Sequence, residues 1–208
     1  KLNYDLVKDF APVSILASTP NILVVHPSLP VKSVKELIVL TKLRPGQLDF
    51  ASAGSGSSSH LAGELFNSMG GVKLTHIPYK GGGPAVVALI SGQVPVGFAT
   101  TPSVMPHVTS GRLRGLAVTG DRRLSLAPDL PTISEAGIKG YEASTWYGLL
   151  VPAATPVDII NRLHATTVKI LALDDLKKRL ESSGFQGIGS TPKEYAAYTT
   201  SEIEKWAK

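Results

Sequence analysis

The stretch from residue 48 to residue 85 shows the same arrangement twice: a short apolar strand, a glycine-rich loop and a helix. The first loop is Ser52–Ser59, the second is Tyr79–Gly83, and Pro84 suits the first turn of the second helix. Because the carboxyl ends of neighbouring parallel strands meet at one edge of an open α/β sheet, both loops are expected at the edge where ligands usually bind. This repeated arrangement restricts the chain to α/β folds.

Both loops are suited to binding an anion through the backbone. Their side chains are small, and the helix after the first loop is predicted to begin near Ser57 or Ser58. The first N–H groups of a helix have no intrahelical partner and lie at its positive dipole end. Two such helix N-termini at one edge of a sheet favour a carboxylate or a phosphate.

The segments on either side continue the alternation of strands and helices. Strands are predicted at residues 13–17, 22–26, 48–52, 72–78, 94–99, 113–119 and 145–151. Helices are predicted after the capping box Ser33–Glu36, after each glycine loop, from residues 100–103 to Gly111, and from Thr155, Asp174 and Thr191. This alternation with short connections predicts a doubly wound α/β sheet.

Finer features follow from local patterns. Residues 18–21 should separate the first two strands, and a one-turn helix is expected around residues 132–135. The helix after the first loop should bury one stripe: Leu61, Leu65, Phe66 and Met69. The last helix should do the same with Tyr195, Tyr198, Ile203 and Trp206. A proline- and glycine-rich region at residues 121–145 suggests a boundary between two lobes.

Composition excludes several classes of protein. The 21 basic and 16 acidic residues are scattered along the chain, without the basic, aromatic-rich patch of a nucleic-acid-binding protein. The sequence has no apolar run of about 18 residues, as a membrane span requires. The absence of cysteine excludes disulfides and thiolate metal ligands. We therefore expect no nucleic-acid partner, no metal and no cofactor.

Known catalytic motifs are also missing from the first loop. It lacks the third glycine of a dinucleotide fingerprint and the lysine of a P-loop, and the chain has no nucleophile elbow. His60 is either a capping residue or a base, and His76 is expected to be structural. Lys80 either attracts an anion or is simply solvated. Trp146 and Tyr147 form part of a core or of a lid over an organic ligand.

Several blocks of the sequence resemble one family. They are Asp9-Phe10-Ala11-Pro12-Val13, Thr19-Pro20-Asn21, Ala53-Gly54-Ser55-Gly56-Ser57 with His60-Leu61, His76-Ile77-Pro78-Tyr79-Lys80-Gly81, Gly92-Gln93-Val94, Leu130-Pro131-Thr132, and Gly189-Ser190-Thr191-Pro192. These blocks are similar to the periplasmic solute-binding proteins of tripartite tricarboxylate transporters, the Bug or TctC family. The resemblance extends over essentially the whole chain.

The resemblance implies a type II periplasmic-binding-protein fold, with two α/β lobes joined by crossing strands. Residues 17–151 would form lobe 2 with a hinge strand at each end, and residues 1–16 and 152–208 would belong to lobe 1. Family members begin with further βα units that precede the first matching block, so lobe 1 would be incomplete here. The C-terminal helices would then expose apolar faces through which the chain could self-associate.

The resemblance also implies a function, namely capture of a small carboxylate in the periplasm for delivery to membrane permease subunits, without turnover. We expect the following ligand-binding residues: Ser52, Ala53, Gly54, Ser55, Gly56, Ser57, His60, Tyr79, Lys80, Gly81, Gly82, Thr100, Thr101, Thr19 and Trp146. One alternative is an α/β enzyme acting on a phosphorylated or carboxylate substrate, which would need a catalytic dyad near His60. Another is the effector domain of a transcription regulator, although no helix-turn-helix precedes it. Ligand turnover would separate the first two hypotheses.

Overall fold

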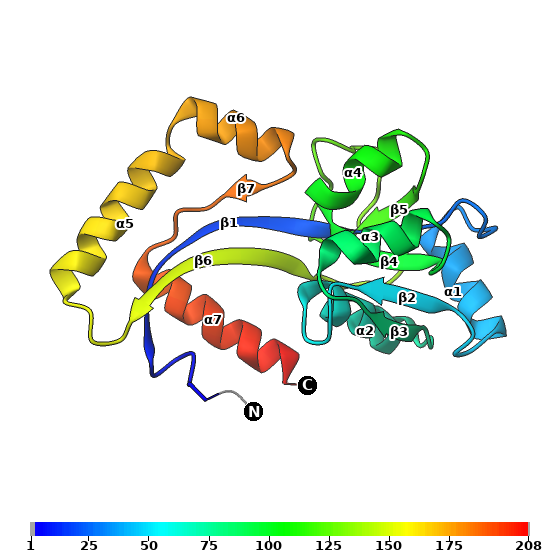
Figure 1. The fold of residues 1–208 in the computed structure, drawn as a ribbon, viewed down its shortest axis with the longest axis horizontal. Helices are drawn as coiled ribbons and strands as arrows, with labels where there is room; N and C mark the ends of the chain where they lie inside the picture. Colours follow the sequence, from blue (N-terminus) through cyan, green and yellow to red (C-terminus); the bar gives the residue numbers. More distant parts are fainter. Residues whose placement is uncertain (1–2, 208) are drawn as a thin grey trace. The chain divides into compact units, whose positions relative to one another are not determined.

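The computed structural model describes residues 3–207 and contains two compact units. One unit comprises the residues up to Ser18 together with those from Trp146 onward, and the other is Thr19–Thr145. Two long strands, β1 (Phe10–Val25) and β6 (Ser144–Pro152), contribute residues to both units (Figure 1). The assignment of lobes at residues 16/17 and 151/152 stays a prediction.

The unit 19–145 is built on a mixed sheet with the strand order β3-β2-β4-β1-β5. In addition to β1, its strands are β2 (Asp49–Ser52), β3 (Thr75–Pro78), β4 (Val96–Thr100) and β5 (Arg114–Val118). β2 is parallel to both β3 and β4, whereas β1 is antiparallel to β4 and β5. The predicted βα alternation therefore produces the parallel strands, and β1 lies among them in the opposite direction.

Helices cover both faces of this sheet. On one face, α3 (Gly82–Ile90) and α4 (Thr101–Thr109) pack on an aliphatic cluster that includes Ile22 and Val24 of β1. On the other face lies α2 (Ser58–Gly70), whose Phe66 contacts Phe98 of β4. Gly63 brings α2 close to the sheet, because a Cβ at this position would lie 2.2 Å from the Phe50 ring. α1 (Val34–Leu43) follows its N-cap Ser33, whose side chain accepts from the Glu36 N–H as predicted. The other half of the predicted capping box differs, because the Glu36 carboxylate accepts from the Lys32 N–H.

Three local predictions were wrong. Residues 18–21 do not interrupt a strand. Pro20 lies between Ser18, which pairs with β7, and Asn21, where the pairing with β4 begins. The predicted stripe of α2 was wrong in part: Phe66 is buried, but Leu61 and Leu65 are half-buried and Met69 is exposed. The rest of the buried face is Ser59, Ala62 and Gly63, because small residues allow the helix to approach the sheet. Residues 132–135 form a hydrogen-bonded turn rather than a helix.

The second unit contains three helices, α5 (Val157–Leu171), α6 (Asp174–Ser182) and α7 (Pro192–Trp206), and the two-residue strand β7 (Gln186–Gly187). β7 pairs with Ala17 and Ser18 of β1 and is too short to be predicted from sequence. Tyr195 of α7 is buried, but Ile203 is exposed, so the predicted apolar stripe of α7 is only partly covered. Neither α5 nor α6 has a buried residue. Among residues 3–207, no helix combines the length and the apolar character that crossing a bilayer requires.

Candidate functional site

The glycine loops lie next to each other at one edge of the sheet. Because β3, β2 and β4 are parallel neighbours, the segments that follow them lie at the same edge. Two backbone hydrogen bonds join the loops directly: the Tyr79 N–H donates to the Ser52 carbonyl and the Gly81 N–H to the Ala53 carbonyl, each over 3.0 Å. The sequence prediction that both loops share one edge is confirmed.

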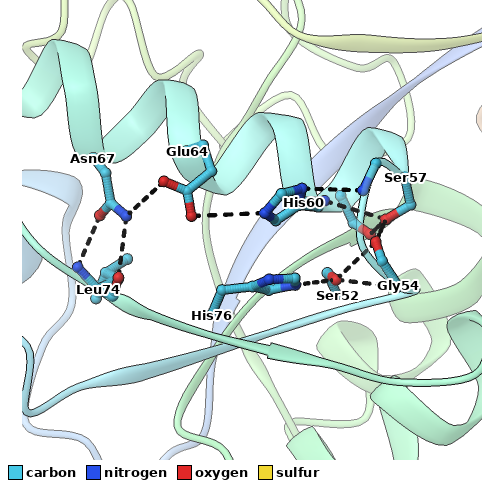
Figure 2. Close-up of polar contacts among 10 residues, drawn as sticks. Ser52, Gly54, Ser57, His60, Glu64, Asn67, Leu74 and His76 are labelled. Atoms are coloured by element: carbon cyan, nitrogen blue, oxygen red, sulfur yellow. Dashed lines mark hydrogen bonds and ion pairs between the residues drawn. The ribbon is translucent and has the colours of Figure 1, made fainter. Parts of the chain in front are cut away.

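The first loop is held together by its own serines (Figure 2). Ser57 is the N-cap of α2; its Oγ accepts from the His60 N–H over 3.3 Å and donates to the Gly54 carbonyl over 2.6 Å. The Ser52 Oγ accepts from the Gly54 N–H over 3.1 Å, and the Ser59 Oγ accepts from the Ala53 N–H over 2.9 Å. The loop is therefore an ordered turn that ends at a helix N-terminus.

Three glycines of the loops adopt backbone angles that other residues rarely reach. The φ angles are +130° at Gly54, +79° at Gly56 and +106° at Gly81. Gly54 is also confined, because a Cβ there would lie 3.2 Å from the Tyr79 carbonyl oxygen. At Gly56 and Gly81 the space around the Cα is open.

The backbone N–H groups of the loops differ in their availability. Those of Gly54 and Gly56, which the sequence suggested as anion donors, already donate to Ser52 and His60. Among the hydrogen bonds of the described residues, none uses the N–H groups of Ser55, Ser58, Ser59, Gly82 and Gly83. The last four of these belong to the first turns of α2 and α3. The donors open to a ligand are thus neighbours of the glycines that shape the loop.

The threonines of the predicted site face inward. The Thr101 Oγ1 donates to the Pro20 carbonyl over 2.8 Å, and the residue is fully buried. Thr100 precedes α4, and its Oγ1 lies 3.0 Å from the Ser103 Oγ. Thr19 is fully buried, and its Oγ1 donates to the Pro20 carbonyl. These contacts bring the end of β4 to residues 19–21 of β1, at the same edge as the glycine loops.

Two histidines stack behind the first loop. The rings of His60 on α2 and His76 on β3 lie 4.0 Å apart at an angle of 31°. The His76 Nε2 is 2.6 Å from the Ser52 Oγ, and the His60 Nε2 is 3.8 Å from Glu64 Oε1 (Figure 2). Burial, and secondly the nearby His60, hold the pKa of His76 below its ordinary value, and Glu64 opposes this shift. The sequence suggested only that His76 was structural and did not predict this pairing.

The remaining predicted residues have more exposed positions. Lys80 is exposed in the second loop, and Tyr79 is half-buried. Trp146 belongs to the other unit, where its ring packs against Tyr195 and Tyr198 of α7 at 5.8 and 5.5 Å between centroids. The site assignment of these residues stays a prediction.

A small polar cluster beside the start of α2 was not predicted. The Thr145 Oγ1 donates to the Ser58 Oγ over 2.7 Å, and the amide of the buried Asn21 lies next to it, with its Oδ1 3.5 Å from the same hydroxyl. Ser59, whose Oγ accepts from the Ala53 N–H, was not predicted either. Only the three-dimensional fold brings these residues together, since 124 positions separate Asn21 from Thr145. Among the described residues, no group of histidine, aspartate and glutamate side chains could hold a metal ion.

The chain matches a known family along its whole length. The model of the tripartite tricarboxylate transporter family receptor, TctC, matches residues 1–208. Protein BugT of Bordetella pertussis is 35% identical over 204 residues, which are 98% of this chain and 63% of BugT. The chain thus spans less than two thirds of the length of this curated relative.

Solved structures agree with this match. The Rpa4515 protein of R. palustris, solved with adipate, is 37% identical with a TM-score of 0.94, and the match covers 100% of this chain and 69% of that one. MatC of Rhodopseudomonas palustris, with bound malate, is 31% identical with a TM-score of 0.91, over 99% of this chain and 71% of that one. The predicted fold class, a partial type II periplasmic-binding-protein fold, is confirmed by these matches. The chain therefore belongs to the tripartite tricarboxylate transporter receptor family, TctC.

Proposed function

We propose that the chain is the ligand-binding part of a periplasmic protein that captures a small carboxylate for a tripartite tricarboxylate-type transporter. The observation that carries this proposal is the set of unpaired N–H groups in the first turns of α2 and α3, on two joined loops at one sheet edge. Such groups bind anions without any side-chain charge. The relatives solved with adipate and malate support a carboxylate rather than a phosphate.

Binding without turnover fits the chemistry of these loops better than catalysis. Beside the first loop, the contact between Ser52 and His76 resembles a nucleophile with its base. However, Ser52 is only 1% exposed, and its Oγ is already bonded to Gly54. A nucleophile has to reach the substrate, so this pair supports the loop instead. Among the described residues of the first loop, no other serine hydroxyl contacts a histidine ring, so the enzyme alternative is not favoured.

We assign roles within the site as follows. The N–H groups of Ser55, Ser58 and Ser59 donate to the oxygens of one ligand carboxylate. The N–H groups of Gly82 and Gly83 donate to the same carboxylate. The exposed Lys80 attracts the anion from solution. The other predicted residues shape the loops and the adjoining ends of β1 and β4, and a ligand-binding role for Trp146 stays a prediction.

Calorimetric titration of the purified protein with adipate and malate tests this proposal, together with mass spectrometry of small molecules that co-purify. Gly54→Val should abolish binding, because the branched side chain meets both a φ of +130° and the Tyr79 carbonyl. Gly111→Val is a matched control: its φ is +71°, but it precedes β5, at the opposite edge of the sheet. Steady conversion of a bound acid would contradict the proposal, as would equal loss of binding in both variants.

Two further parts of the proposal concern partners. Delivery of the ligand to membrane permease subunits, and a periplasmic location, are supported by the family match. Self-association is supported by the exposed apolar side chains of α5, including Val157 and Ile159.

A further inference from the structure

His60, in the first turn of α2, makes hydrogen bonds to the first loop through both its ring and its backbone. Its Nδ1 accepts from the Gly56 N–H over 3.1 Å, while its own N–H donates to the Ser57 Oγ over 3.3 Å. This reciprocal arrangement resembles a capping box, in which the side chain three residues after the N-cap is usually a glutamate or glutamine. Here the acceptor is an imidazole nitrogen, so its ability to accept depends on protonation.

The hydrogen bond from Gly56 fixes the form of the ring. Nδ1 must be unprotonated to accept, so the proton of the neutral imidazole is on Nε2, which faces Glu64 Oε1 at 3.8 Å. An imidazolium carries a proton on both nitrogens and accepts from neither. A second proton on His60 therefore removes the acceptor of the Gly56 N–H.

His76 makes a contact that tolerates either form. Its Nε2 lies 2.6 Å from the Ser52 Oγ, which also accepts from the Gly54 N–H. Because a hydroxyl both donates and accepts, this contact persists whether or not Nε2 carries a proton. His60 thus accepts directly from the Gly56 N–H, whereas His76 supports the Gly54 N–H through the Ser52 hydroxyl. Only the hydrogen bond from Gly56 is lost on protonation.

The charged surroundings of the pair are few. From α2, Glu64 faces both rings. On β2, Phe50 stacks on His76, so the adjacent Asp49 points to the opposite face of the sheet. Residues 52–59 of the loop carry no charge, and Tyr79 and Lys80 follow β3 in the second loop.

We propose that His60 is a pH-sensitive positioning residue: its neutral ring fastens Gly56 and orders the first loop, and its protonation releases that amide. This rests on the proposed function only in that the ordered loop presents the carboxylate-binding amides. Acid then weakens binding, because a loosened loop must be ordered again when ligand binds.

The hydrogen bond itself can be measured without any ligand. In ¹⁵N-labelled protein, a scalar coupling across the bond should link the Gly56 amide nitrogen to the His60 Nδ1 at neutral pH. It should disappear as the His60 ring resonances titrate, while the Gly81 amide, which donates to the Ala53 carbonyl, keeps its own bond. A coupling that persists on the protonated ring, or that is absent at neutral pH, would overturn the proposal.

The functional consequence is tested by His60→Asn, in which the Oδ1 occupies the place of Nδ1 but does not titrate. Between neutral pH and about pH 5.5, the adipate affinity of the unmodified protein should fall about two- to tenfold more than that of the variant, as expected for one hydrogen bond. Protonation of adipate affects both proteins equally and cancels in this comparison. Equal losses would refute the role of His60. If neither protein binds adipate, the proposed function fails while the coupling still decides the proposal.

Discussion

At the scale of single residues, the glycines of the first loop can be ranked by their surroundings. Gly54→Ala combines a φ of +130° with a carbonyl oxygen 3.2 Å from the new Cβ, whereas Gly56→Ala has a φ of +79° and open space. A left-handed backbone costs an ordinary residue about 1–2 kcal/mol, and asparagine tolerates it better. We expect thermal unfolding to show the largest loss for Gly54→Ala, a smaller loss for Gly56→Ala and the smallest for Gly56→Asn. A Gly54→Ala variant as stable as the unmodified protein would contradict the φ-based argument.

The sequence predicted where the first loop lies but not which hydrogen bonds its backbone amides make. Glycine spacing and the helix start near Ser57 were sufficient to locate the loop between β2 and α2. Which amides are free could not be predicted, because the partners of Gly54 and Gly56 depend on side-chain directions at Ser52 and His60. The stacking of His76 on His60 depends on the pairing of β2 with β3, which is a tertiary feature.

At the scale of elements, the contact between α2 and the sheet depends on one glycine. A Cβ at Gly63 would lie 2.2 Å from the ring of Phe50, which is fully buried. Gly63→Ala should therefore destabilise the protein by about 1–3 kcal/mol through overpacking, although alanine usually favours a helix. Chemical denaturation measures this loss.

A second substitution separates packing from helix propensity. Phe50→Leu shortens the side chain that meets the new Cβ, so the double variant Gly63→Ala/Phe50→Leu should lose less stability than the two single losses together. Strictly additive losses would show that the two residues do not interact. Gly82→Ala, with open space in the first turn of α3, is the control expected to cost nothing.

The start of α7 carries a pH-dependent contribution. Thr191 and Glu194 form a complete capping box, and the Thr191 N–H and then its hydroxyl hold the pKa of Glu194 below its ordinary value. A lowered folded-state pKa stabilises the protein above the unfolded-state pKa, and this contribution is lost as the pH falls through the folded-state pKa. Glu194→Gln should therefore have a lower Tm than the unmodified protein at neutral pH. The difference should shrink as the pH falls below about 4.3, the ordinary pKa of glutamate, and vanish only below the lowered folded-state pKa. A difference that stays constant with pH would contradict the assignment.

Helices and strands were predicted correctly where local sequence signals were strong, and incorrectly where tertiary contacts determine the backbone conformation. The capping signals at Ser33 and Thr191 correctly marked the starts of α1 and α7. The strand break expected at Pro20 did not occur, because β1 changes its pairing partners at that point.

At the scale of the whole molecule, the C-terminal unit leaves apolar surface uncovered. Val157, Ile159 and Leu173 are 71%, 46% and 53% exposed, and α5 and α6 have no buried residue. A few hundred Å² of such surface corresponds to several kcal/mol at about 25 cal/mol per Å², against a typical stability of about 5–15 kcal/mol. The chain should therefore either self-associate through this face or hold residues 155–208 loosely.

Light scattering after size exclusion, together with hydrogen exchange, distinguishes these outcomes. Self-association should give a mass above 21.9 kDa that rises with concentration and returns to the monomer value in Ile159→Asp/Leu173→Asp. Val39→Asp is a control, because Val39 is equally exposed but lies on α1 in the other unit. A monomer in which residues 155–208 exchange as slowly as residues 48–99 would show that neither outcome occurs.

The central claim is that backbone amides on two joined glycine loops bind a carboxylate. Its most direct test is an NMR titration of the ¹⁵N-labelled chain with adipate, with the uncharged diamide adipamide as a control of equal length. We predict saturable shifts of the amide resonances of Ser55, Ser58, Ser59, Gly82 and Gly83 with adipate only, while the adipate spectrum itself stays unchanged. Absence of these shifts, equal shifts with adipamide, or conversion of the acid would contradict the account.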